Sequence, residues 1–219
     1  STAISKLKSE QGNSENQQGL PLLDKGAENL TQTEKFSREL FATVAATSQN
    51  GTMDQAAIDT LGASLAEKIK NPVVRKVFLL SDIKIIDNDT RQAIQKYSDV
   101  LNNIYFKYPI KKGVIAILQE FINDGENVNI LSELDSVINQ TNKIINESVK
   151  IQVPQSLSLL HLDLINNFQK VEENISDMKL FDSDTIVEIG AISQYEKNAL
   201  AVMSSAKKLT DTIKQKLNN

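Results

Sequence analysis

The sequence of 219 residues has no cysteine, one histidine, 8 glycines and 4 prolines. The absence of cysteine excludes disulfides, thiol catalysis and cysteine-based metal sites, although it does not fix the cellular compartment. A single histidine also excludes a nitrogen-rich metal site within one chain. We therefore expect no metal and no other cofactor. The scarcity of glycine and proline predicts long helices joined by short loops.

Three further absences limit the function. No run of about 18 apolar residues is present, so no segment of this sequence is expected to span a membrane. The net charge of −4 offers no basic footprint for a phosphate backbone, so we expect no nucleic-acid partner. No glycine-rich phosphate loop and no nucleophile elbow occur, so neither a nucleotide-dependent enzyme nor a serine hydrolase of that type is indicated.

The stretch from Val153 to Leu180 predicts the central helix of the fold. Its apolar residues recur every three or four positions, as on one face of a helix. This stripe consists of Leu157, Leu160, Leu164, Phe168, Val171, Ile175 and Met178. The first half adds Leu159, Leu162 and Ile165. We therefore expect it to be enclosed nearly all round, with Pro154 at the helix start and Ser156 as a candidate cap.

The same periodicity predicts an all-α protein, an antiparallel bundle of about seven helices. The other expected helices cover about 31–49, 52–71, 90–108, 110–123, 130–151 and 182–219. Their predicted caps are Thr31 or Thr33, Asp89 or Thr90, and the cluster Asp182-Ser183-Asp184. Asp124-Gly125 predicts a turn.

The expected domain organisation is a flexible N-terminal tether over residues 1–30 and a single helical domain over 31–219. The tether is polar and lacks a sustained apolar period. The helical domain divides into a hairpin, a connection and a main bundle, at 31–71, 72–89 and 90–219. Residues 73–87 are rich in β-branched side chains that partly alternate, which predicts a short extended segment.

His161 is the first candidate for chemistry, because it is the single histidine of the chain. An enzyme would place it in a solvent-open pocket with Tyr195 or Asp163. We expect instead a buried, neutral imidazole bonded to Tyr195, Asn166 or an aspartate. The candidate structural polar residues are therefore His161, Asn166, Tyr195 and Ser156.

Two acidic triplets, Asp87-Asn88-Asp89 and Asp182-Ser183-Asp184, resemble the opening of a calcium loop. Such a loop needs glycine at its sixth position and glutamate at its twelfth. The sequence has Gln92 and Ser98 after the first triplet, and Val187 and Ser193 after the second. Both triplets are better explained as helix caps.

Four aromatic residues precede Pro109, namely Tyr97, Tyr105, Phe106 and Tyr108. They are candidates for a partner-binding surface. The alternative is a helix-packing seam in the core, which is the more common role of such a cluster.

Several short motifs resemble those of membrane-anchored, all-helical envelope proteins of candidate-phyla bacteria, the Parcubacteria and their relatives. The motifs are Val153-Pro154-Gln155-Ser156 with His161-Leu162 and Asn166, Asn29-Leu30-Thr31, Ser81-Asp82-Ile83, and Asp184 with Gln194-Tyr195. The resemblance implies a helical domain outside the cytoplasm and a membrane anchor upstream of Ser1. It implies location rather than activity.

We therefore expect a non-catalytic, extracytoplasmic domain that binds an unknown protein partner or serves as a structural part of an envelope, surface or secretion assembly. Its only expected membrane contact is through the upstream anchor. The alternatives are a helical sensor domain for a small molecule or lipid, an enzyme that uses His161, and a cytoplasmic location.

Overall fold

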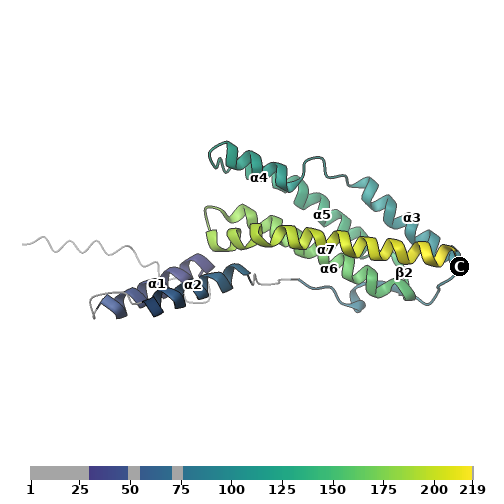
Figure 1. Cartoon of the computed structure of the whole chain (residues 1–219). Helices are drawn as coiled ribbons and strands as arrows, with labels where there is room; N and C mark the ends of the chain where they lie inside the picture. Colours follow the sequence, from purple (N-terminus) through teal and green to yellow (C-terminus); the bar gives the residue numbers. More distant parts are fainter. Residues whose placement is uncertain (1–29, 49–54, 71–75, 219) are drawn as a thin grey trace, which may run out of the picture. The chain divides into compact units, whose positions relative to one another are not determined.

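The computed structural model describes residues 30–48, 55–70 and 76–218, and one compact unit runs from Thr31 to Asn219. The tether predicted for residues 1–30 therefore lies almost wholly outside the described residues. The described ranges contain seven α-helices, which confirms the all-α fold (Figure 1). These are α1 (Gln32–Ser48), α2 (Gln55–Lys70), α3 (Arg91–Lys107), α4 (Val114–Asn123), α5 (Leu134–Ser148), α6 (Ser158–Asp177) and α7 (Thr185–Asn218).

Most helix boundaries follow from caps and breaks in the sequence. Thr31 accepts a hydrogen bond from the Glu34 amide at 3.0 Å and Thr90 accepts one from the Ala93 amide at 3.3 Å, so both predicted caps are confirmed. The helix predicted from Ile110 begins later, at Val114, because Gly113 has an extended backbone and is its N-cap. The helix predicted from Ile130 begins as a 3₁₀ turn and becomes α-helical at Leu134. The ends predicted at 49–54 and 71–72 lie outside the described residues.

A two-stranded parallel sheet joins two connecting segments that lie far apart in the sequence. Strand β1 (Lys84–Ile86) pairs with β2 (Gln152–Pro154), with Ile85 opposite Val153. The extended segment predicted within 73–87 is therefore confirmed. Strand β2 was not predicted, because its 3 residues are too few to show an alternating pattern. Pro154 ends this strand instead of opening a helix, and the 3₁₀ turn Gln155–Leu157 separates it from α6.

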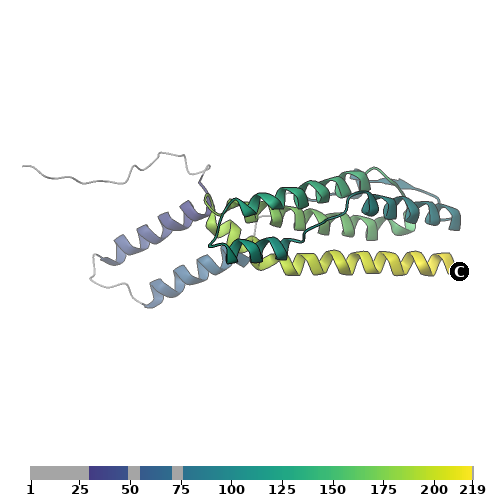
Figure 2. The ribbon, with the colours of Figure 1, turned by 90° about the horizontal axis from the view of Figure 1, so that it is seen from above.

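Helix α6 packs against α5 and against the 34-residue helix α7 (Figures 1 and 2). The predicted stripe faces these neighbours, with Leu157, Leu164 and Met178 at most 2% exposed. The expectation that the first half of α6 is enclosed all round is wrong, because Leu159 is 68% exposed. Two flanking helices leave one face of α6 to solvent, and Leu159 lies on that face.

Two larger apolar clusters form the core. The first joins α4, α5, α6 and α7, and its fully buried members include Leu134 and Met178. The second joins α3, β2, α6 and α7 around Val153, Leu157 and Leu164. Each fully buried aliphatic side chain of this size contributes about 1.5–3 kcal/mol of transfer free energy. Helices α6 and α7 contribute to both clusters, so they hold the two halves of the core together.

Candidate functional site

His161 is fully buried, beside Tyr97 of the second apolar cluster. Its Nε2 lies 3.1 Å from the Ser148 carbonyl oxygen, and its Nδ1 lies 2.8 Å from the Tyr97 hydroxyl. A carbonyl only accepts, so Nε2 carries the proton and Nδ1 accepts from the tyrosine. Burial lowers the pKa of His161 to about 4, and the bond to the Ser148 carbonyl opposes part of that shift. The imidazole is therefore neutral near pH 7, with both nitrogens occupied.

The predicted partners of His161 are wrong. The contact is made by Tyr97 of α3, whose ring meets the imidazole edge-on at 5.6 Å between centroids. Asn166 instead binds the backbone of Phe78, accepting from its amide at 2.8 Å and donating to its carbonyl at 3.1 Å. Tyr195 packs against the first core cluster. The sequence offered no signal for Tyr97, which lies 64 positions away.

Ser156 does not cap α6 as predicted, because α6 begins after Leu157 with no side-chain cap. Ser156 instead donates its backbone amide and its hydroxyl to Asp89, at 3.1 and 2.6 Å. These bonds hold the pKa of Asp89 below its ordinary value, the hydroxyl bond having the larger effect. Asp89 therefore holds the turn after β2 in place through Ser156 and does not cap α3.

Asp184 joins the starts of two helices, α1 and α7. Asp184 is 7% exposed. Its carboxylate accepts from the backbone amides of Gln32 and Thr33 at 2.7 and 3.0 Å, and from the Thr33 hydroxyl at 2.7 Å. The Thr33 hydroxyl in turn accepts from the Ile186 amide at 3.1 Å. Each side chain thus satisfies amides that the other helix leaves unpaired. The role of Asp184 as a cap was predicted, but its bonds to α1 were not.

Glu188 lies one helical turn after Asp184 and is also buried. Burial raises the pKa of Glu188, and the charge of Glu126 adds to the increase. Glu126 belongs to the turn after α4, where both Gly125 and Glu126 have positive φ, 67° and 63°. The predicted Asp124-Gly125 turn therefore brings an acidic side chain toward the start of α7.

Tyr97 also forms part of a cleft of about 270 Å³ between α3 and the small sheet. The cleft is lined by Ile86, Asn88, Thr90, Gln92, Ala93, Lys96, Tyr97, Val100 and Gln152. Its walls combine aliphatic side chains with amides and one ammonium group. This mixture of apolar and polar lining suits a small amphipathic ligand.

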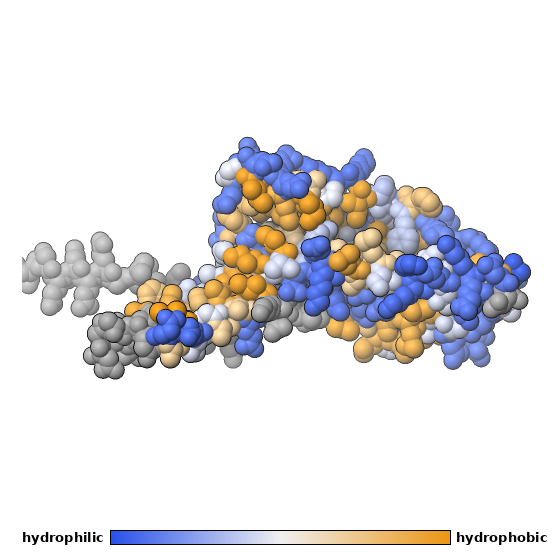
Figure 3. Space-filling model, viewed as in Figure 1, coloured by the Kyte–Doolittle hydropathy of each residue, from blue (hydrophilic) through white to orange (hydrophobic). Residues whose placement is uncertain are grey.

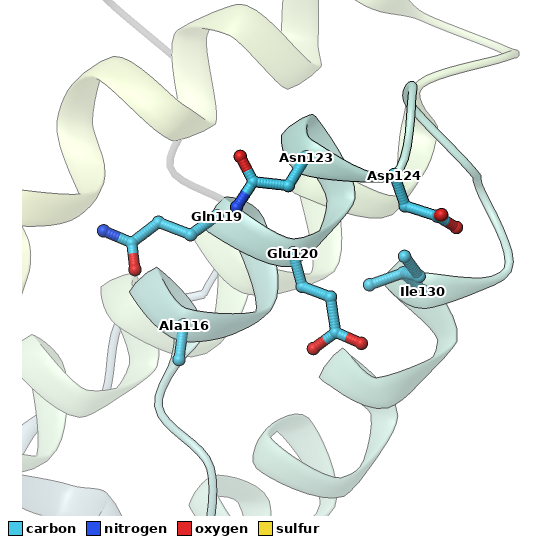
Figure 4. Close-up of a pocket in the computed structure, with 6 residues that line it drawn as sticks. All are labelled: Ala116, Gln119, Glu120, Asn123, Asp124 and Ile130. Carbon is cyan, nitrogen blue, oxygen red and sulfur yellow. The ribbon is translucent and has the colours of Figure 1, made fainter.

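Figure 4 shows a larger and shallower depression beside α4, of about 560 Å³. It is lined by Ala116, Gln119, Glu120, Asn123, Asp124 and Ile130. Its polar side chains do not converge, since the Gln119 amide and the Asp124 carboxylate point to opposite sides. The Glu120 carboxylate is already paired with Lys112. Within the described residues, no three His, Cys, Asp or Glu side chains are grouped to hold a metal ion.

The surface carries several exposed apolar side chains, and Figure 3 shows hydrophobic areas along α4 and α7. On α7 they are Ile189, Ile192, Leu200 and Met203, which we call the α7 stripe. The predicted aromatic cluster divides between core and surface, with Tyr97 at 2% exposure and Phe106 at 84%. No described helix is both long enough and apolar enough to cross a membrane.

Comparison with known proteins gives no match to a protein-family model, to a curated protein or to a solved structure.

Proposed function

We propose that this chain is a non-catalytic helical domain that works through its surface, as a protein-binding or structural component of a bacterial envelope, surface or secretion assembly. The α7 stripe is the observation that carries this proposal. The enclosed imidazole of His161, with both nitrogens bonded, supports a structural rather than a catalytic role for that residue. The location outside the cytoplasm rests on the resemblance to anchored envelope proteins, and we propose no nucleic-acid partner.

The α7 stripe has the geometry of a helix-packing surface. Its four side chains are 45%, 41%, 56% and 67% exposed in chain order. Their positions advance by three, eight and three residues, and exposed Glu196 fills the central position of the row. Side chains at this spacing lie on one helical face and anchor a helix laid against them. Glu196 adds a preference for a partner helix with a basic residue at its centre.

Site-specific photo-crosslinking in the source cells tests this proposal. A photoreactive residue at Met203 should give adducts of defined mass with one protein, and cell fractionation should recover them with the envelope. The same residue at Leu159 is a matched control, because that side chain is equally exposed but lies on α6. Equal adduct patterns from both positions, or none from Met203, would contradict the proposal.

The cleft beside Tyr97 favours a second candidate, a sensor domain for a small amphipathic molecule. Native mass spectrometry of the purified chain should then show a co-purified compound. The substitution Val100→Trp should displace this compound by filling the cleft. Ile122→Trp, at an exposed position of α4 outside the cleft, should not displace it. Absence of any bound compound from the unsubstituted chain would leave the protein-binding proposal as the better one.

A further inference from the structure

The stretch from Val100 to Gln119 differs in charge from the rest of the chain. It contains three lysines and no acidic residue, although the whole chain has a net charge of −4. It covers the second half of α3, the loop that follows, and the first half of α4. In Figures 1 and 2 these elements lie along one side of the main bundle. Lysines that lie together on an acidic protein favour an anionic surface as their partner.

This stretch also exposes large apolar side chains. Phe106 is 84% exposed, the highest value among the large hydrophobic residues of the described chain. Ile110 and Ile115 are 46% and 53% exposed. Exposed aromatic and aliphatic side chains beside lysines are typical of segments that lie in the headgroup region of a bilayer.

The cations gather around the loop after α3. The ammonium groups of Lys107 and Lys143 lie 5.1 and 5.7 Å from the centroid of the Tyr108 ring. Lys111, in the loop itself, is exposed. Lys112 is neutralised by ion pairs with Glu120 and Glu133, so it is not counted. Glu147 lies near Lys107 but is itself paired with Lys150, so we count Lys107, Lys111 and Lys143 as the available cations.

A cavity of about 190 Å³ lies behind the same loop. It is lined by Ile110, Lys111, Lys112, Glu133, Ser136 and Val137. Its volume equals that of about six water molecules in the liquid. Lys112 and Glu133 in this lining neutralise each other as an ion pair. The remaining polar groups, from Lys111 and Ser136, lie beside Ile110 and Val137 and suit a phosphate headgroup with the start of its apolar chain.

We propose that residues 106–115 dock this domain on the surface of an anionic phospholipid bilayer. Phe106, Ile110 and Ile115 enter the boundary between headgroups and acyl chains, and the three available lysines face lipid phosphates. This contact goes beyond the proposed function, in which the membrane is reached only through an upstream anchor. The aliphatic side chains favour a bilayer over a nucleic acid, which offers them no apolar layer.

Tryptophan fluorescence tests the insertion directly, because the chain contains no tryptophan. In the full chain, Phe106→Trp introduces a single reporter, and Leu159→Trp gives a matched control at a position 68% exposed on α6. Vesicles of equal parts phosphatidylglycerol and phosphatidylcholine should shift the emission at position 106 to shorter wavelength and protect it from an aqueous quencher. Pure phosphatidylcholine should do so far less, and position 159 should not respond. An unshifted emission at 106, or equal shifts at both positions, would overturn the proposal.

Co-sedimentation of the unsubstituted chain with the same vesicles gives an independent measurement. Lys107→Gln and Lys111→Gln should each lower the partition coefficient about fivefold, whereas Lys208→Gln on α7 should leave it unchanged. Millimolar inorganic phosphate should not release the chain, which separates a bilayer from a free anion. Unchanged partition in both lysine variants would refute this surface. Binding to duplex DNA in place of vesicles, lost in these variants, would assign the stretch to nucleic acid and also refute it.

Discussion

Two buried polar contacts hold this fold together in different ways. The Asp184 carboxylate at the start of α7 and the Thr33 hydroxyl at the start of α1 each accept hydrogen bonds from the other helix, and most of the donors are backbone amides. At His161, a neutral imidazole links α3 and α6 to the end of α5 through a side chain and a carbonyl. The contact at Asp184 satisfies backbone amides at the starts of both helices, which would otherwise need separate caps. The contact at His161 makes a polar group tolerable inside an apolar core.

The largest effect is expected from Asp184→Ala. The substitution removes the acceptor of two backbone amides and of the Thr33 hydroxyl, so we expect a loss of about 4 kcal/mol. Asp184 ties α1 to α7, so in this variant the backbone amides of α1 should exchange hydrogen much faster than those of α6. Hydrogen exchange with mass spectrometry measures this. Asp182→Ala, at an exposed position two residues earlier, should change stability by less than about 0.5 kcal/mol.

A pH titration should give the next largest effect. The pKa of His161 falls from 6.5 to about 4 on folding, so between these values the unfolded chain binds the extra proton and stability falls with falling pH. The free energy of unfolding should decrease by about 3 kcal/mol from pH 7 to pH 4 through this residue. The raised pKa of Glu188 acts in the opposite direction. The two ring C–H resonances of His161, the single histidine, should titrate in the proton NMR spectrum with a midpoint near pH 4, and a midpoint above 6 would show an accessible ring.

Tyr97→Phe should cost about 2 kcal/mol, because it leaves the buried Nδ1 of His161 without a donor. Urea unfolding followed by circular dichroism measures the change. Tyr195→Phe is the matched control, since Tyr195 is one of the partners that the sequence suggested, whereas in the structure both His161 nitrogens are bonded to Tyr97 and Ser148 and Tyr195 packs against the first core cluster. Equal losses in the two variants would show that the hydrogen bond to His161 contributes little.

The same two contacts show what could be predicted from this sequence. Helix positions, the Thr31 and Thr90 caps and the buried stripe of α6 depend on neighbours within a few residues, so periodicity and capping rules found them. Tyr97 lies 64 positions from His161, and the partners of Asp184 on α1 lie about 150 positions away, and no local pattern carries that information. Leu159 was misplaced for a related reason, because hydrophobicity shows which face is apolar but not how many helices cover it.

The smallest effect concerns the contact of α2 with α7, close to Asp184. A methyl group on Gly190 would lie 3.1 Å from the backbone carbonyl oxygen of Ile69, closer than a comfortable contact. Gly62, inside α2, has nothing within 4 Å of the same position. Gly62→Ala should therefore stabilise the protein by up to about 1 kcal/mol through helix propensity alone. Gly190→Ala should lose that gain and destabilise by about 1 kcal/mol, because two helix backbones must separate. Thermal unfolding compares the two variants, and equal stabilisation by both would mean that α2 does not approach α7 closely in solution.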